Sequence, residues 1–248
     1  MFSIIGKPVN VVDYLKSNSG KMMWTPKFIV LHNTAEPTLA QRPKGFTGQQ
    51  MINLQGYYSG MGWQGGPHFF VDQDEVWAFN PITKKGTHSP SYNSVAIGVE
   101  MLGDYNIESF SSGDGLKVKN MTMDLLAKLC DHFNFNPSTI KLHKEDPKTT
   151  HDCPGKNVIK TDVINCVANL MIKNTKIVIY RKGYGHDPVG VVSGTFENGS
   201  NYAKVEDLEK IVGFNNGFSG IAKVVNVLGN KYTFSWDEPN LKLYCVEK

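Results

Sequence analysis

The stretch Lys27-Phe28-Ile29-Val30-Leu31-His32-Asn33 contains four consecutive apolar residues followed directly by a histidine. A short apolar run of this length is typical of a buried β-strand. The run therefore predicts a strand over residues 27–33 with an imidazole at its end. A second such run predicts another strong strand over residues 95–102, which would bury the acidic Glu100.

Further elements extend from these two strands in both directions. Apolar and polar residues predict a β-hairpin with strands at 67–72 and 75–79 and a tight turn at Gln73-Asp74. Apolar residues at helical spacing predict helices over 10–17, 47–58, 122–133 and 156–172. The helix at 47–58 should carry Met51, Leu54, Tyr57 and Tyr58 on one face. The helix at 122–133 should be amphipathic, with Leu125, Leu126, Leu129 and Phe133 at helical spacing. Together these elements predict an α/β fold with a mixed central β-sheet flanked by helices.

A change in composition near residues 173–175 divides the chain of 248 residues. Beyond it, short strand-like runs occur at 176–180, 189–192 and 231–236, and one helix is predicted at 205–212. We expect a first domain over residues 1–174 and a small α+β domain over residues 175–248. A segment of roughly 70 residues is near the lower size limit for independent folding.

Charge and cysteine usage exclude several classes of protein. The net charge of +3 is too small to predict a nucleic-acid partner. No apolar run is long enough for a membrane span, and the first residues do not form a signal peptide. The four cysteines include no CxxC pair, which argues against a disulfide scaffold. Cys130 and Cys166 fall within apolar helical patterns and are expected to be buried thiols, whereas Cys153 stands in a polar loop.

The segment 142–155, LHKEDPKTTHDCPG, supplies His143 and Cys153, and His32 lies far upstream. Two imidazoles and one thiolate form a three-ligand zinc set that leaves the fourth position open for water. Either histidine alone is more often a packed or capping residue, but a histidine and a cysteine in one polar loop strengthen the joint interpretation. A purely structural zinc site remains an alternative, and His151 is the one residue close enough in sequence to serve as its fourth ligand.

Amide hydrolysis at such a centre also requires a proton acceptor and a group that faces the oxyanion. Glu100 is the best candidate for the base, because a buried carboxylate is costly without a function or a partner. A structural salt bridge is the alternative for this residue. His151 is a candidate to stabilise the transition state, although it could simply be a solvated loop residue. His68 and His88 are weaker candidates for substrate contact.

These residues, in this order, resemble the zinc-dependent N-acetylmuramoyl-L-alanine amidase family, which includes phage endolysins and peptidoglycan-recognition proteins. The resemblance covers about residues 25–172. It lies in five ordered segments, at residues 28–35, 66–76, 86–100, 142–143 and 153–155. Two positions differ from the family pattern: His151 stands where phage-type members often have a lysine, and Pro67 stands where the hairpin usually has a tyrosine.

The resemblance implies a fold and a reaction. The fold is a mixed sheet flanked by helices, with zinc held in a surface groove by His32, His143 and Cys153. The reaction is cleavage of the amide between the lactyl group of N-acetylmuramic acid and L-alanine in bacterial peptidoglycan. The resemblance further implies that Glu100 activates water, that His151 stabilises the transition state and that His88 contacts the glycopeptide.

The sequence therefore predicts an endolysin-type hydrolase whose residues 175–248 bind a cell-wall polymer. We expect synthesis in a host cytoplasm and action on the cell wall after release, with no nucleic-acid partner and no insertion into a membrane. A bacterial autolysin or a recycling amidase would use the same chemistry. A non-catalytic peptidoglycan receptor is the alternative from another class, but such members commonly lack the cysteine that is present here as Cys153.

Overall fold

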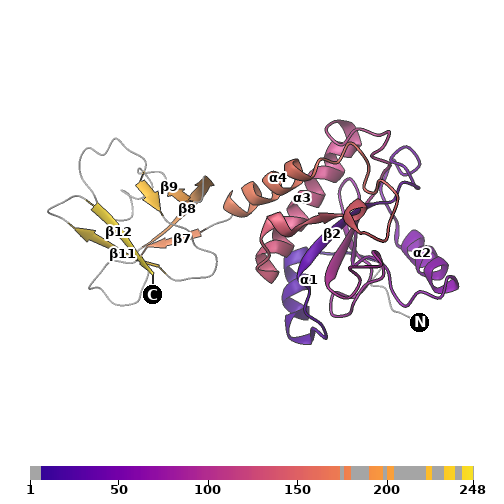
Figure 1. Ribbon diagram of the computed structural model, residues 1–248, viewed down its shortest axis with the longest axis horizontal. Coiled ribbons are helices and arrows are strands. Elements are labelled where there is room, and N and C mark those ends of the chain that lie inside the picture. Colours follow the sequence, from indigo (N-terminus) through magenta and orange to yellow (C-terminus); the bar gives the residue numbers. More distant parts are fainter. Residues whose placement is uncertain are drawn as a thin grey trace. The chain divides into compact units, whose positions relative to one another are not determined.

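A six-stranded β-sheet forms the centre of the N-terminal part of the chain in the computed structural model (Figure 1). Its strand order is β1-β4-β3-β5-β2-β6. The strands are β1 (Lys7–Pro8), β2 (Phe28–Asn33), β3 (Phe69–Val71), β4 (Val76–Ala78), β5 (Ala96–Met101) and β6 (Lys141–Leu142). The pairs β2–β5, β2–β6 and β3–β5 are parallel, whereas β3–β4 and β1–β4 are antiparallel. The predicted mixed sheet is thereby confirmed.

The structure describes residues 7–173 continuously and, after them, only six strands, at 176–179, 190–197, 200–203, 222–224, 232–237 and 242–247. The chain divides into two compact units, Met1–Val167 and Ala168–Lys248. This division falls inside the last described helix, a few residues before the predicted boundary near residue 175.

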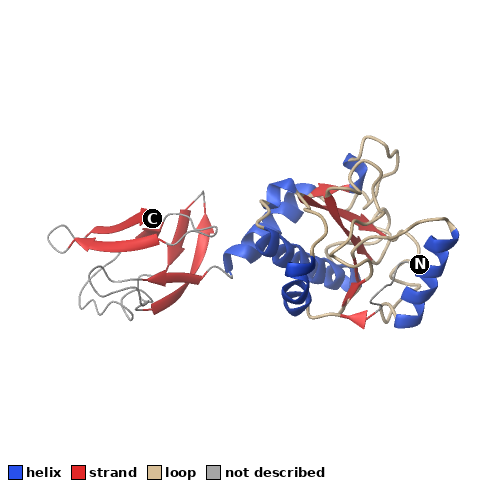
Figure 2. Ribbon diagram, turned by 90° about the horizontal axis from the view of Figure 1, so that it is seen from below, coloured by secondary structure: helices blue, strands red, loops and turns tan. Residues whose placement is uncertain are grey.

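Helices lie on both faces of the six-stranded sheet. They are α1 (Val11–Asn18), α2 (Gly48–Gly60), α3 (Gly113–Phe133) and α4 (Lys160–Lys173), with short 3₁₀ helices η1 (Ser19–Lys21), η2 (Pro137–Thr139) and η3 (His143–Glu145). Two perpendicular views show α1 and α3 on one side of the sheet and α2 on the opposite side (Figures 1 and 2). The flanking helices predicted from periodicity are therefore present.

Two of the helices begin more than one residue away from their predicted starts. Helix α3 begins at Gly113 rather than Thr122. Glycines 113 and 115 weaken the helical pattern there, yet the backbone at Gly115 packs so closely on Ser109 that no Cβ would fit. Helix α4 begins at Lys160 rather than Lys156, because the preceding residues form turns and the Asn157 amide donates to the Tyr105 carbonyl.

Helix α2 packs on the sheet less extensively than its sequence pattern suggested. A capping box starts the helix, with the Thr47 hydroxyl accepting from the Gln50 amide and the Gln50 side chain accepting from the Thr47 amide. Met51 is buried, whereas Tyr57, which the sequence places on the same face, is 62% exposed. The helix ends at Gly60 and is followed by four exposed residues, 61–64.

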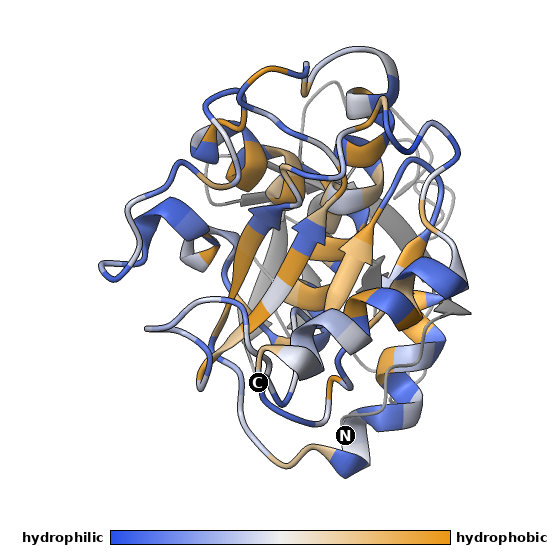
Figure 3. Ribbon diagram, turned by 90° about the vertical axis from the view of Figure 1, so that its right-hand side faces the viewer, coloured by the Kyte–Doolittle hydropathy of each residue, from blue (hydrophilic) through white to orange (hydrophobic). Residues whose placement is uncertain are grey.

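Every residue of the central strand β5 is buried except Glu100, which is half-buried. Ile97, Val99 and Met101 of β5 are fully buried, and α3 contacts the sheet at β3. On the other face of β5 stand Ala96, Gly98 and Glu100, since successive side chains point to opposite sides. Figure 3 shows the central strands as hydrophobic along most of their length, with hydrophilic residues at their tips. These polar tips are where the site lies.

The C-terminal unit contains strands at the three positions that the sequence predicted, near 176–180, 189–192 and 231–236, and three further strands that it did not predict. The strands are β7 (Lys176–Ile179), β8 (Gly190–Glu197), β9 (Ser200–Ala203), β10 (Ala222–Val224), β11 (Tyr232–Asp237) and β12 (Lys242–Glu247). They form a four-stranded sheet, β10-β9-β8-β7, and a two-stranded sheet, β11-β12. The predicted helix at 205–212 lies outside the described residues. Within the described part of the chain, no helix has the length and apolar character needed to cross a bilayer.

Candidate metal centre and active site

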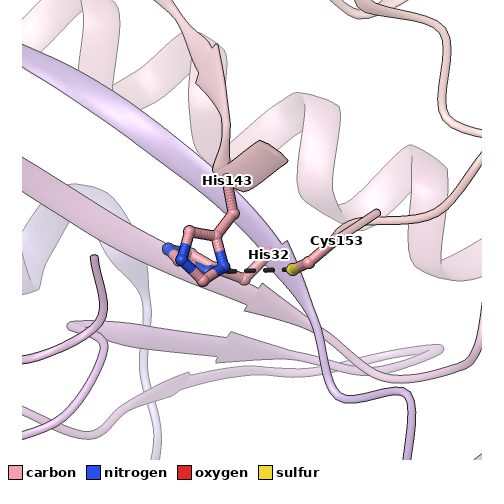
Figure 4. A group of neighbouring side chains, drawn as sticks. All are labelled: His32, His143 and Cys153. Atoms are coloured by element: carbon pink, nitrogen blue, oxygen red, sulfur yellow. Dashed lines mark hydrogen bonds between the residues drawn. The ribbon is translucent and has the colours of Figure 1, made fainter. Parts of the chain in front are cut away.

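Three segments far apart in the sequence bring His32, His143 and Cys153 together (Figure 4). Strand β6 pairs in parallel with β2 through Val30–Lys141 and Leu31–Leu142. The residue that follows in the chain is His32 within β2, and His143 at the start of η3 after β6. Cys153 reaches the same point from the loop that follows η3. One ligand atom from each of the three residues lies within 4.8 Å of the other two. The structure thus brings together all three predicted ligands.

The donor atoms fit a tetrahedral zinc ion. His32 Nδ1 lies 3.9 Å from Cys153 Sγ, whereas ideal zinc bonds would place nitrogen and sulfur about 3.5 Å apart. His143 Nε2 is buried and has no hydrogen-bond partner in the described part of the chain. The Asn33 amide donates to Cys153 Sγ over 3.4 Å, which favours a sulfur atom that accepts. Two imidazole nitrogens and one sulfur match the ligand preferences of zinc, so these residues fit the ion.

The protonation states of the ligands also suit a cation. Burial lowers the pKa of His143 to about 4, with the nearby His151 as a further cause, so the ring is neutral near pH 7. Burial and then the Glu100 carboxylate raise the pKa of the Cys153 thiol above its usual value. A divalent cation reverses the second effect, because a coordinated thiol loses its proton. Metal binding here would therefore release a proton and depend on pH.

His151 lies beside the ligand group but outside it. Its side chain is exposed, and its ring centre is 4.6 Å from that of His143. Among the residues described, only His32, His143 and Cys153 form a potential metal-binding group. The alternative of a closed structural site with His151 as fourth ligand is not the arrangement that this structure adopts.

Glu100 stands next to His32 across the parallel strands β5 and β2, with their Cα atoms paired in register. Its side chain is half-buried, and burial raises its pKa to about 8. Its negative charge contributes to the raised pKa of both Cys153 and Tyr58, for which burial is the larger cause. No described residue forms an ion pair or a hydrogen bond with this carboxylate. The salt-bridge alternative for Glu100 thus finds no partner in residues 7–173.

His88 contacts a ligand residue. Its Nδ1 lies 3.0 Å from His32 Nε2, and its Nε2 lies 3.1 Å from the Ala96 carbonyl oxygen. The side chain is 9% exposed, and burial lowers its pKa to about 4. The predicted contact of His88 with a substrate stays a prediction, whereas its contact with His32 was not anticipated from the sequence.

His68 is enclosed in the fold. Its Nδ1 accepts from the Gly98 amide over 3.0 Å, and its Nε2 donates to the Lys84 carbonyl over 3.0 Å. The ring is completely buried and stacks on Trp24, with ring centres 5.3 Å apart. Both ring nitrogens are therefore committed to backbone groups, which does not favour the predicted substrate contact.

Asp146 and Tyr58 lie near the predicted site residues, although the sequence did not predict a role for either. Asp146 is buried and accepts from the Ser89 hydroxyl and from the Ser91 and Lys148 amides. It thereby joins the loop that carries His143 to the segment that carries His88. Burial and, as a smaller cause, the nearby Glu100 carboxylate raise the pKa of Tyr58 of α2. An Asp-Pro pair three residues after a ligand was the only sequence signal for Asp146.

Comparison with known families identifies the N-terminal unit. The family profile described as N-acetylmuramoyl-L-alanine amidase matches residues 23–156, more than half of the 248-residue chain. The matched region includes His32, Glu100, His143 and Cys153.

Individual proteins give weaker similarity over the same region. Peptidoglycan-recognition protein SC2 of Drosophila melanogaster is 25% identical over 134 residues, which is 53% of this chain and 69% of the relative. The amidase LysC from Clostridium intestinale is 22% identical, with a TM-score of 0.46, over 66% of this chain and 91% of its own. Drosophila PGRP-LB is 17% identical, with a TM-score of 0.46, over 57% of this chain and 81% of its own.

Proposed function

The chain belongs to the N-acetylmuramoyl-L-alanine amidase family, and we propose that it is a zinc-dependent hydrolase of bacterial peptidoglycan. The bond cleaved is the amide between the lactyl group of N-acetylmuramic acid and L-alanine. The single observation that carries this proposal is the convergence of His32, His143 and Cys153 within 4.8 Å, beside a carboxylate that has no partner among residues 7–173.

The ligand residues and Glu100 divide the chemistry between them. His32, His143 and Cys153 would hold zinc, which supplies a Lewis acid that lowers the pKa of water and polarises a carbonyl oxygen. Glu100 takes the proton from the attacking water and later delivers it to the leaving amine. Burial raises the pKa of this carboxyl to about 8, so near neutral pH it exchanges between the charged form that accepts a proton and the neutral form that delivers one.

His151 supports the reaction from the exposed side of the centre. Its ring lies against that of His143 and can reach into solvent, where the substrate must approach. An imidazole N–H at this position donates to the oxygen that becomes negative in the transition state. His151→Ala should lower the rate of cleavage, whereas His132→Ala on the distant surface of α3 should not.

The arrangement favours an enzyme over a non-catalytic receptor, because a receptor needs neither three convergent ligands nor a free carboxylate. Purified peptidoglycan digested with the protein should yield new L-alanine amino termini, detected by mass spectrometry. A chelator should abolish their release, and added zinc should restore it. New reducing ends, or intact stem peptides on the sugar chains, would refute the proposed bond.

We further propose that residues 175–248 bind a cell-wall polymer and that the protein acts as an endolysin, reaching the wall from a host cytoplasm. Two tethered sites on one polymer raise the effective concentration of the catalytic unit at its substrate. A chain ending at residue 174 should co-sediment less with purified walls than the full chain. Equal co-sedimentation would refute a targeting role for this part.

A further inference from the structure

We propose that His88 is a positioning residue that fixes which nitrogen of His32 faces the metal. The inference rests on the proposed metal centre, and it assigns to His88 a contact with a ligand residue in place of a contact with substrate. Its basis is a chain of hydrogen bonds that runs from the backbone of β5 through His88 to His32.

The Ala96 carbonyl at one end of these hydrogen bonds determines which nitrogen donates in each of them. The Ala96 carbonyl oxygen can only accept, so Nε2 of His88, 3.1 Å away, carries the hydrogen. Nδ1 of the same neutral ring must then accept, and its partner 3.0 Å away is Nε2 of His32, which donates. The remaining nitrogen of His32, Nδ1, keeps its lone pair and faces Cys153 Sγ over 3.9 Å. Only this tautomer of His32 presents a lone pair to the metal.

The His88 ring occupies space that is free because residue 98 is a glycine. Gly98 of β5 lies directly beneath it, and a Cβ at that position would lie 2.6 Å from two ring carbons of His88. The rings of His88 and His32 meet edge to face, with centres 5.1 Å apart and planes at 85°. Any side chain at position 98 would push the imidazole away from His32.

Hydrogen bonds also fix the backbone around His88. Asn93 Oδ1 accepts from the amides of both His88 and Ser89 over 2.7 Å. The Ser89 hydroxyl donates to Asp146, which lies three residues after the ligand His143. The segment is therefore tied both to β5 and to the loop of a second ligand, as outer residues of metal sites commonly are.

His68 provides a contrast within the same protein. It is also a buried, neutral histidine, and it also bonds to the backbone of β5 through the Gly98 amide. Its other nitrogen, however, bonds to the Lys84 carbonyl rather than to a ligand. Substitutions at His68 and His88 should thus perturb packing to a similar extent, but only those at His88 should alter the metal centre.

The test measures zinc affinity of the full-length protein by competition with a chromophoric chelator. His88→Phe keeps the ring shape but removes the acceptor, and it should weaken zinc binding about 10- to 100-fold. His88→Asn retains an acceptor near the Nδ1 position and should stay within about threefold of the wild type. Gly98→Ala should weaken binding like His88→Phe, and His68→Gln should not.

A second readout needs no metal and no activity. Long-range ¹H–¹⁵N spectra of the metal-free protein should show His32 with its hydrogen on Nε2 in the wild type and in His88→Asn. In His88→Phe the same ring should show a mixture of tautomers. Unfolding midpoints of every variant establish that each is folded. If His88→Phe does not fold, the comparison of His88→Asn with Gly98→Ala still tests the proposal.

The outcomes separate this inference from the proposed function. If the wild type binds zinc and cleaves peptidoglycan while His88→Phe and Gly98→Ala bind zinc equally well, the positioning role is refuted. If the wild type binds zinc and His88 controls the His32 tautomer but no amide is cleaved, the inference stands and the proposed function fails.

Discussion

Glu100 shows how a single residue acquires its chemistry from its surroundings. In sequence it is an acidic residue at the end of an apolar run. In the structure it is paired in register with His32 and half-buried, and burial raises its pKa to about 8. The strand explains why the carboxylate stands beside the ligands, and the lack of a pairing residue within 7–173 explains why it is free to exchange a proton.

Replacement of this carboxylate gives the first prediction. Glu100→Gln preserves size and removes the proton acceptor, so we expect cleavage of peptidoglycan to fall about 10²- to 10⁴-fold. Zinc content should be unchanged, because Glu100 is not among the three ligands. Release of L-alanine amino termini and zinc analysis of the same samples would check both parts. Glu75→Gln, an exposed change in the hairpin turn, is the matched control and should be neutral.

The carboxylate of Asp146 joins two segments of the chain, the one around Ser89 and Ser91 and the one that follows His143. Burial alone would raise its pKa, but hydrogen bonds from Ser89, Ser91 and Lys148 outweigh that effect and hold the pKa well below its usual value. A lowered folded-state pKa means that the bonds stabilise the protein above about pH 4 and lose their effect as the pH falls below it.

Asp146→Ala should therefore lower the free energy of unfolding by about 3 kcal/mol at pH 7, since charged acceptors of several hydrogen bonds are costly to remove. Asp124→Ala breaks only an exposed ion pair with Lys128 and should cost about 0.5 kcal/mol. Urea unfolding of both variants at pH 7 and pH 3 gives the comparison. A loss at Asp146 that is as large at pH 3 as at pH 7 would contradict the charge-based explanation.

At the scale of elements, the loop 146–155 contains no helix or strand and supplies the third candidate ligand. It turns at Gly155, where φ is +106° and a Cβ would lie 2.4 Å from the Tyr105 backbone carbon. The conformation and the close approach both require glycine here. Because Gly155 is two residues from Cys153, the position of the sulfur depends on this packing.

Gly155→Ala should consequently weaken zinc binding as well as stability, because the loop must shift away from Tyr105. Gly62→Ala is the control, since Gly62 also has a positive φ, +80°, but has open space around it. That variant should lose about 1 kcal/mol from backbone strain alone and keep its zinc affinity. Equal zinc affinity of the two variants would show that the contact with Tyr105 does not position Cys153.

At the scale of the whole molecule, buried histidines make the fold sensitive to acid. Burial lowers the pKa of His68 to about 3 and those of His88 and His143 to about 4. The unfolded chain takes up these protons near pH 6.5, whereas the folded protein resists them. Unfolding therefore consumes protons between about pH 6.5 and pH 3–4, and stability falls as the pH falls through this range.

We expect the metal-free protein to lose stability between pH 7 and pH 5, with His68 alone accounting for about 2 kcal/mol of that loss. Urea unfolding in chelator at the two pH values measures the change. His68→Gln removes one titrating ring, so its stability should depend less steeply on pH than that of the wild type. An identical pH dependence in both proteins would refute this assignment.

Local patterns predicted the elements of the N-terminal unit well and their boundaries less well. Strands 27–33 and 95–102 were predictable because apolar runs report burial directly. The start of α3 at Gly113 was not, because close packing against Ser109 overrides the low helix propensity of glycine. The outward position of Tyr57 was likewise undetermined, since periodicity gives a face but not what covers it.

Residue chemistry and local apolar patterns were enough to predict the mixed sheet, the three candidate ligands and the candidate base. Only the tertiary structure decided that His88 contacts His32, that His68 is enclosed by backbone partners and that His151 lies outside the ligand group. The physical reason is that an imidazole has the same donor and acceptor atoms at every position. Its role is set by the groups that other strands and loops place within hydrogen-bonding distance.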